Sequence, residues 1–294
     1  MPYPPKPLFE ADPAASTPFA EPAFPVAQST RELRLRTARR EITERRRITQ
    51  RLRQALSDND FVLHYQPLVS LQSGLIRGAE TLIRLRHARR GLITANHFMP
   101  IAERSDIIND IGGWMLQRAC LEASTWPGCI SVAVTLSLRH LQSGRLVRQL
   151  QEALNRSGLT PERLELELTE SILIDDNDDT VFSLKALQAI GIRMALNNFG
   201  IGYASLSALK RLPLTTLRLD RSMIQNLGES QSDAAIAHAA IDAGHALGCT
   251  VLADGVETER QFVLLGQIGC DEGQGAYFSQ PVCATEMAAM FAEG

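Results

Sequence analysis

The sequence has few aromatic residues, no strong excess of charge and no long hydrophobic run. Aromatic residues make up 5% of the 294 residues, and the formal net charge is only -3. This balance gives no signal for a nucleic-acid partner, which typically requires a basic surface. The most apolar helical stretch, residues 234–247, is interrupted by His238, Asp242 and His245. We therefore expect no membrane span.

Cysteines are few, and their spacing excludes the usual zinc and disulfide patterns. Their number is odd and no two stand in a CxxC arrangement, which indicates a reducing compartment and no structural zinc. The N-terminus also lacks the basic-then-apolar pattern of a secretory signal. We therefore expect a cytoplasmic protein. The five cysteines are Cys120, Cys129, Cys249, Cys270 and Cys283.

Proline is concentrated at one end of the chain. Residues 1–30 hold 8 of the 14 prolines, and closely spaced prolines prevent a helix. The segment also has too little apolar mass for a core, so we predict a disordered arm there. The whole chain is 45% hydrophobic, which is enough for one large folded domain or two small ones after the arm.

Residues 31–53 are rich in arginine and contain no glycine or proline. Ten arginines against three glutamates stand in a stretch of good helix formers. We predict a basic linker helix over residues 31–56, which leads into a folded domain over residues 57–294 and faces a protein partner or a second copy. No aromatic residue is interleaved with the arginines, so RNA fits poorly and no nucleic acid is expected.

From Phe61 onward, short apolar runs alternate with longer amphipathic stretches. Eight strands alternating with helices predict an α/β fold of the TIM-like (β/α)8 barrel type. An open doubly wound sheet would normally carry a glycine-rich turn after its first strand, and none is present. The predicted strands are residues 61–67, 76–83, 131–136, 163–169, 192–197, 215–219, 250–254 and 274–278. The helical patterns include residues 113–125, 143–157, 179–190, 233–247 and 258–268.

Polar side chains close nearly every predicted strand. In a β/α barrel the catalytic groups sit at the carboxyl ends of the strands, and packing alone does not explain so many acids and amides there. Together they predict a polar site at the carboxyl end of the barrel, whose oxygens could ligate a hard cation such as Mg²⁺ or Mn²⁺. The residues are Gln66, Glu80, Arg84, Thr135, Glu167, Glu170, Asn197, Asn198, Arg218, Asp220, Asp254, Glu257 and Gln274.

Several blocks of this sequence resemble those of EAL domains. Residues 61–87 read FVLHYQPLVSLQSGLIRGAETLIRLRH, with Glu80-Thr81-Leu82 where the name-giving Glu-Ala-Leu stands. The later blocks match in order and spacing, so that the resemblance covers about residues 50–285. They read LELELTES, NNFGIGYASL, LRLDRS, ADGVETERQ and GCDEGQGAYFSQP. The resemblance implies an EAL-type (β/α)8 barrel and cyclic di-GMP as its ligand.

The resemblance also implies a chemistry and a set of site residues. Active EAL enzymes cut one phosphodiester of cyclic di-GMP to give linear pGpG, and they use two divalent metals. Any Mg²⁺ or Mn²⁺ retained here would be held weakly, by Glu80, Glu167 and Asn197. Glu170 would support a nearby loop. The implied ligand-binding residues are Gln66, Glu80, Leu82, Arg84, Asp220, Glu257 and Gln274.

Five positions depart from the family pattern, and all of them bear on water activation. Amides replace two adjacent aspartates at Asn197 and Asn198, which removes charge on which hard cations depend. Arg218 replaces a lysine and cannot act as a base, because its pKa exceeds about 12. Asp254 replaces a glutamate and withdraws its carboxylate by one methylene, and Thr135 replaces an asparagine. We therefore expect no efficient hydrolysis.

Three functions stay open on the sequence alone. The first is a non-catalytic receptor for cyclic di-GMP, because Arg84 and Arg218 reduce the electrostatic repulsion between the pocket and phosphate. The second is a scaffold that no longer binds nucleotide, and the third is a weak metal-dependent phosphodiesterase. Arg218 could equally form a plain salt bridge with Asp254 or Glu167. The resemblance further implies a homodimer, formed around residues 198–209, or a protein partner.

Overall fold

The computed structural model describes residues 43, 45–169, 172, 178–200 and 206–293. The predicted arm and the first part of the predicted basic helix lie outside these ranges, while residues 45–57 are helical. Residues 46–294 form one unit of their own. Within the described ranges, no helix combines the length and hydropathy that a bilayer crossing requires.

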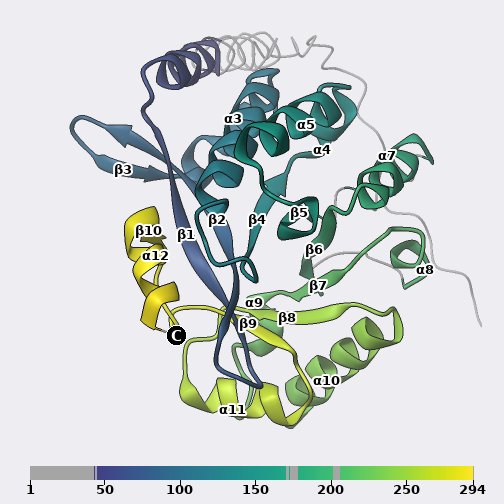
Figure 1. Ribbon diagram of the computed structural model, residues 1–294. Coiled ribbons are helices and arrows are strands. Elements are labelled where there is room, and N and C mark those ends of the chain that lie inside the picture. The colour runs from purple at the N-terminus through teal and green to yellow at the C-terminus, as the bar shows by residue number, and fades with distance from the viewer. Residues whose placement is uncertain (1–42, 44, 170–171, 173–177, 201–205, 294) are drawn as a thin grey trace, which may run out of the picture. The chain divides into compact units, whose positions relative to one another are not determined.

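Eight strands close into a barrel. Parallel pairings join β2 to β4 and continue in chain order to β9, and β1 pairs with both β2 and β9 (Figure 1). The predicted TIM-like barrel is therefore confirmed. Its strands are β1 (Phe61–Ser70), β2 (Ile76–His87), β4 (Ser131–Leu136), β5 (Leu164–Leu168), β6 (Arg193–Phe199), β7 (Thr216–Leu219), β8 (Thr250–Asp254) and β9 (Glu272–Gln274). Two strands outside the barrel, β3 (Gly91–Thr94) and β10 (Val282–Cys283), pair with β2 and β1.

The first strand runs against the other seven, a feature that the alternating pattern does not reveal. β1 and β2 are antiparallel over nine residue pairs, and β1 is antiparallel to β9 as well. Only residues 71–75 connect β1 to β2, and so short a link permits a hairpin but no parallel crossover. Gly74 takes a φ of 72° in this turn, which glycine adopts without strain.

The eighth barrel strand lies earlier than predicted, at Glu272–Gln274 instead of residues 274–278. Gly275 follows it with a φ of 153°, and a Cβ at this position would lie 2.1 Å from the backbone oxygen of Val256. The chain therefore leaves the strand direction at a point where only glycine fits. The apolar residues after Gly275 belong to the turn that follows, so the prediction placed this strand too late in the chain.

Helices cover the strands, and the five predicted ones correspond to α3, α5, α7, α10 and α11 (Figure 1). Side chains fix some of their starts: at α11, Thr258 and Gln261 form a reciprocal capping box. The longer helices are α3 (Ile107–Ala123), α5 (Leu146–Ser157), α7 (Asp178–Ala189), α10 (Gln231–Ala246), α11 (Glu259–Gln267) and α12 (Ala284–Glu293). The short ones are η1 (Ala95–His97), α2 (Met99–Ala102), α4 (Leu138–Gln142), η2 (Pro161–Arg163), α8 (Leu206–Leu209) and α9 (Arg221–Ile224).

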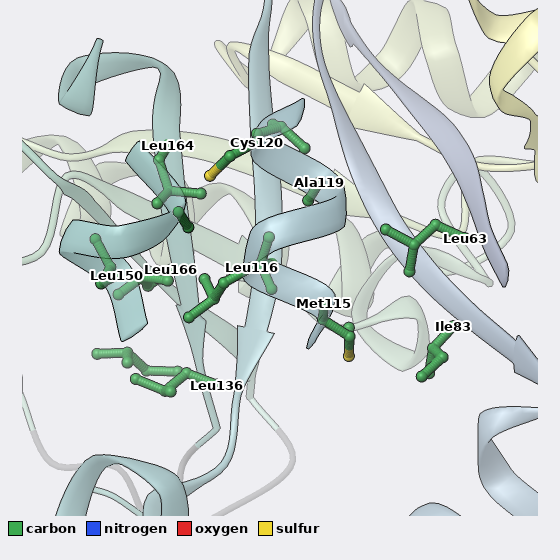
Figure 2. Packing of buried hydrophobic residues seen from close by; sticks show 14 of the residues in the cluster. Leu63, Ile83, Met115, Leu116, Ala119, Cys120, Leu136, Leu150, Leu164 and Leu166 are labelled. Atoms are coloured by element: carbon green, nitrogen blue, oxygen red, sulfur yellow. The ribbon is translucent and has the colours of Figure 1, made fainter. Parts of the chain in front are cut away.

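The sequence LELEL of β5 divides its side chains between the core and the barrel interior. Its three leucines are fully buried in the main hydrophobic cluster. Figure 2 shows Leu166 near Leu116 of α3 and Leu150 of α5. Because side chains alternate along a strand, Glu165 and Glu167 point the other way, into the barrel. Both glutamates are nevertheless buried, so each needs a partner there.

Part of the barrel interior is apolar. Leu68, Ala133 and Leu252 form a small buried cluster of their own. Thr135 follows Ala133 by two residues on β4, and Asp254 follows Leu252 by two residues on β8, so each pair shares a strand face. The packed interior therefore gives way to polar side chains toward the carboxyl ends of the strands.

Candidate ligand pocket

Arg218 lies at the centre of a polar network at the carboxyl ends of the strands. Its side chain, on β7, is only 3% exposed. The guanidinium donates hydrogen bonds to Glu167 on β5, to Glu80 on β2 at 2.7 Å and to Gln274 on β9. One side chain thus joins three strands that are not neighbours in the sheet. The expected salt bridge to Glu167 is present, and the second acid bonded is Glu80, since no hydrogen bond joins Arg218 to Asp254 among the described residues.

Glu167 accepts hydrogen bonds at both carboxylate oxygens. Oε1 accepts from Arg218, while Oε2 accepts from Thr135 Oγ1 at 3.1 Å and from Asn197 Nδ2 at 2.9 Å. The side chain is completely buried. The amide oxygen of Asn197 is also buried and has no hydrogen-bond partner in the described part of the chain. A water or a ligand donor that reached this oxygen would relieve a costly unpaired acceptor.

Gln274 extends the network to the first strand. Its Nε2 donates to Glu80 Oε2 at 2.7 Å and to Gln66 Oε1 at 3.2 Å. Gln66 in turn donates from Nε2 to the backbone oxygen of Ser279 at 3.0 Å. Three predicted ligand-binding residues from β1, β2 and β9 therefore lie together, with their orientations set by one another.

Burial and ion pairing set the charges in this pocket. Burial raises the pKa of Glu167 above its usual range, and Arg218 opposes that rise. Burial alone would lower the pKa of Arg218, but the nearby carboxylates of Glu167, Glu80 and Asp254 more than offset it, so its pKa lies above the ordinary value. Burial likewise raises the pKa of Asp254, with Arg218 opposing. The guanidinium is thus a permanent charge, held where three carboxylates converge.

This donor set fits a divalent metal poorly. Hard cations need several oxygens with free lone pairs, whereas the carboxylates of Glu80 and Glu167 already accept hydrogen bonds from Arg218. An entering ion would have to displace the Arg218 guanidinium from both of these carboxylates, which would leave Asp254 as its nearby charged group. Asn197 keeps one unpaired oxygen, but a single amide oxygen supplies no charge.

Arg84 and Leu82 follow Glu80 on the same face of β2, and both are half-buried. Arg84 Nη1 donates to the backbone oxygen of Ile83 at 3.1 Å, and Arg84 forms no ion pair with a described residue. Burial lowers the pKa of Arg84, and Glu80 opposes this. A guanidinium with remaining donors and no acid partner suits a phosphate oxygen.

Asp220 and Glu257, two further predicted ligand residues, have local partners at the rim. Asp220 is the N-cap of α9 and accepts from the Ser222 backbone N–H at 2.8 Å. Glu257 lies 2.7 Å from Arg221, in an exposed ion pair. Sequence reasoning missed Arg221, although it directly follows Asp220 in the LRLDRS block, because nothing in the spacing shows that it reaches Glu257.

One predicted residue stands apart from the network, and another cannot be placed against it. Asn198 follows Asn197 on β6, is exposed and takes a φ of 61°, a conformation that asparagine adopts more readily than most residues. Its exposure places it outside the bonds around Arg218. Glu170, the predicted loop support, lies outside the described residues.

The pocket belongs to a recognisable domain. A family model described as "EAL domain" matches residues 49–281. The chain belongs to the EAL domain family. This EAL domain is 39% identical over 245 residues to the bifunctional diguanylate cyclase/cyclic di-GMP phosphodiesterase MucR of Pseudomonas aeruginosa, a match covering 82% of this chain and 36% of that protein. It is 37% identical to the cyclic di-GMP phosphodiesterase NbdA of the same organism, with 82% and 31% covered. The chain spans about a third of the length of these curated relatives.

Solved structures agree with this assignment. The PaMucR phosphodiesterase in complex with c-di-GMP superposes with a TM-score of 0.78 at 38% identity, covering 82% of this chain and 99% of that one. The EAL enzyme Bd1971, bound to cAMP and cyclic di-GMP, gives a TM-score of 0.81 at 25% identity, covering 92% and 77%. The EAL-type barrel predicted from the motif blocks is therefore confirmed.

Proposed function

We propose that this EAL domain is a non-catalytic receptor that binds cyclic di-GMP without a divalent metal. The observation that carries the proposal is the buried guanidinium of Arg218 between Glu80 and Glu167. This guanidinium, a cation that is part of the protein, offsets the negative charge of carboxylates that would otherwise repel a dianionic dinucleotide. The relatives named as cyclic di-GMP phosphodiesterases, and the relative solved with that ligand, support the choice of nucleotide.

The same arrangement argues against efficient hydrolysis. Metal-assisted cleavage of a phosphodiester needs a bound ion that lowers the pKa of its water. Arg218 cannot take a proton from a water, because a guanidinium stays protonated. Glu167 is no better placed as a base, since both of its oxygens already accept hydrogen bonds.

Arg84 supplies the phosphate contact in this proposal. It stands two strand positions beyond Leu82 on the face that carries Glu80, with no acid partner among the described residues. Gln66 lies opposite Glu80 and is half-buried, and its amide can pair with a guanine edge once it releases its hydrogen bond to Ser279. Glu80 contributes through Arg218 and Gln274, which it holds in place, and not as a metal ligand.

A weak phosphodiesterase is the second candidate. Identities of 37–39% to proteins named as cyclic di-GMP phosphodiesterases favour it, as does the unpaired amide oxygen of Asn197, which could coordinate one ion. Under this alternative, Mn²⁺ or Mg²⁺ would enter the pocket only by displacing Arg218.

Calorimetric titration of cyclic di-GMP into the full chain with EDTA present tests the receptor proposal. We expect saturable binding, and an affinity that excess Mg²⁺ or Mn²⁺ changes by less than about twofold. If neither heat nor a thermal shift develops at millimolar ligand, the receptor proposal is wrong and the nucleotide-free scaffold takes its place.

Incubation with cyclic di-GMP and Mn²⁺, followed by chromatography, decides between receptor and enzyme. We expect no pGpG above the protein-free control. Steady pGpG formation that the substitution Glu80→Gln abolishes, in a protein with an unchanged melting temperature, would establish the phosphodiesterase.

The substitution Arg84→Ala should weaken metal-free binding about tenfold or more, because a charge-assisted phosphate contact contributes about 1.5–3 kcal/mol. Arg86→Ala is the matched control: Arg86 is the next residue on the same face of β2 and is exposed. We expect it to change affinity by less than about twofold. Equal losses in the two variants would mean that the arginines act only through general charge.

A further inference from the structure

A second hollow lies away from the ligand pocket, beside the helix at residues 45–57 and the hairpin of β2 and β3. Its volume is about 660 Å³, and we call it the hairpin groove. The apolar part of its lining includes Ile48 and Leu52 from the helix and Leu92 and Ile93 from β3. Leu92 is 46% exposed. The groove therefore offers an apolar side chain of a partner a place to be buried.

The rest of the lining of the hairpin groove is mostly basic. Arg51, Arg89 and Arg90 line it together with His87 and His97, and none of the described residues in its lining is an aspartate or a glutamate. None of the three arginines forms an ion pair with a described residue. Three guanidiniums gathered without a counter-charge raise the potential of this surface.

Exposed arginines elsewhere on the domain are of two kinds, some paired with acids and some, such as Arg104 and Arg156, without an ion pair to a described residue. Arg139 lies 2.7 Å from Asp106, and Arg145 lies 2.8 Å from Asp110. Both pairs are exposed and lie outside the groove. The hairpin groove is therefore distinguished by the gathering of three arginines around one hollow, and not by the lack of an ion pair at each of them.

An adjoining hollow of about 490 Å³ carries charges of both signs, because Arg47 and Arg86 line it as well as two aspartates. It shares Arg51 and His87 with the hairpin groove, but its lining also includes Asp58 and Asp60. These acids line only that second hollow. The uncompensated charge is consequently strongest on the Arg89–Arg90 side, next to the exposed Leu92.

We propose that the hairpin groove docks a short acidic segment of a partner protein. One apolar side chain of that segment packs on Leu92 and Ile93, and its carboxylates pair with Arg51, Arg89 and Arg90. Charge complementarity selects this occupant, because the rim carries donors that fit carboxylates and no acid that repels them. The apolar contact supplies the anchor, and the rim charges orient the segment and speed its association.

Two other anionic partners fit the groove less well. An anionic membrane requires apolar side chains that protrude into the lipid, whereas Leu92 and Ile93 line a hollow. Single-stranded nucleic acid is held by bases stacked on several exposed aromatic rings. The phenylalanine of this lining, Phe98, is buried, which leaves only the imidazoles of His87 and His97.

Selection of peptides from a random 12-residue phage library on the full chain tests the proposal. We expect enrichment of sequences with several Asp or Glu around a Leu, Ile or Phe. Labelled copies of the enriched peptides should bind at least about tenfold more weakly to the double variant Arg89→Glu/Arg90→Glu, as measured by fluorescence anisotropy. They should bind without change to the matched double variant Arg104→Glu/Arg156→Glu, whose exposed arginines lie outside the groove.

Several outcomes overturn this proposal. They include an absence of acidic sequences after selection, and acidic peptides that bind the Arg89/Arg90 variant as tightly as the wild type. Co-sedimentation with phosphatidylserine vesicles, or binding of single-stranded RNA, tighter than any peptide and lost in that variant, would assign the groove to a membrane or a nucleic acid. An unchanged melting temperature in both double variants shows that folding is intact, and Leu92→Asp provides a second disruption that removes the apolar anchor.

Discussion

The two glutamates of β5 stand two residues apart in the barrel interior, yet their partners differ. Glu165, toward the amino end of the strand, accepts from Thr216 Oγ1 at 2.8 Å and lies 3.3 Å from Arg193, whose side chain is 34% exposed. Glu167, toward the carboxyl end, pairs with Arg218, and both side chains are buried. Water therefore reaches the cation at one end of the strand and is excluded from it at the other.

This difference separates a structural ion pair from one that also shapes a binding site. The pair of Arg193 with Glu165 joins a partly exposed guanidinium to a buried carboxylate that also accepts a hydrogen bond from Thr216, so loss of Arg193 leaves Glu165 with one partner. A buried pair behaves otherwise, because loss of either partner leaves a charge with neither water nor a counter-ion. The pocket end thus depends on Arg218 for its folding as well as for its charge.

Replacing the two arginines should produce the largest contrast. Arg218→Ala leaves Glu80 and Glu167 without their buried counter-charge, and we expect the free energy of unfolding to fall by about 3–5 kcal/mol. Arg193→Ala should cost less, about 1–2 kcal/mol, because Glu165 keeps its hydrogen bond from Thr216. Urea denaturation followed by circular dichroism measures both. If the two losses are equal, the contrast between the ends of β5 has no energetic basis.

Replacing the two glutamates should give a smaller difference in the free energy of unfolding, again with the larger loss at the pocket end of β5. Both oxygens of Glu167 accept hydrogen bonds, so the amide of Glu167→Gln must turn an N–H toward a donor, at a cost of about 1–3 kcal/mol. Among described residues only Oε2 of Glu165 accepts a hydrogen bond, so Glu165→Gln can keep that bond, and we expect a smaller loss of about 1 kcal/mol from the ion pair with Arg193. Thermal melts at pH 7 compare the two, and a larger loss for Glu165→Gln would contradict the hydrogen-bond argument.

The smallest effect concerns pH, and it should appear at both ends of the barrel. Burial raises the pKa of Asp254 and of Glu272. A raised folded-state pKa gives stability that is complete below the ordinary carboxyl pKa of about 4 and is lost as pH rises through the folded-state value. Asp254→Asn and Glu272→Gln should therefore each gain in melting temperature relative to the wild type as pH increases from about 4.

Ligand affinity then separates those two variants. Asp254 lies at the pocket and Glu272 does not, so only Asp254→Asn should tighten the binding of cyclic di-GMP, by removing a carboxylate that repels phosphate. Melting temperatures in buffers from pH 4 to pH 8, with and without the dinucleotide, measure both effects. Equal tightening by Glu272→Gln would show that overall charge matters more than position.

Patterns along the chain predicted the barrel because each strand carries its own signal. In β5 the leucines and glutamates alternate, and the helix-facing leucines indicate burial on one face. Strand direction carries no such signal, and the antiparallel β1 was therefore not foreseen. The position of β9 depends on the close approach of Gly275 to the backbone of Val256. These residues are distant in the sequence, so the prediction followed the apolar run after Gly275 and placed the strand too late.

The membership of the pocket was predictable to a similar degree. β/α topology brings the carboxyl ends of parallel strands together, so Glu80 and Gln274 could be placed in one site. The same argument placed Gln66 there, but in the antiparallel β1 it is the register with β2 that sets Gln66 opposite Glu80. The partners of Arg218 could not be chosen, because a long side chain crossing the barrel can reach several strands. The capping role of Asp220 and the ion pair of Glu257 depend on local chain geometry after the strands, which spacing does not encode.

Each seam of β1, meaning its backbone pairing with one neighbouring strand, has a different length, and this difference has a consequence for the motions of the barrel. Two residue pairs join β1 to β9, against nine between β1 and β2. Local opening starts where backbone pairing is shortest, and each opening at this seam also withdraws Gln274 from Gln66 and Glu80. Amide hydrogens near this seam should therefore exchange with solvent faster than those of β5. A dinucleotide held by the same side chains would slow that exchange. Amide exchange at the pairing of β1 with β9 would therefore report whether the pocket is occupied.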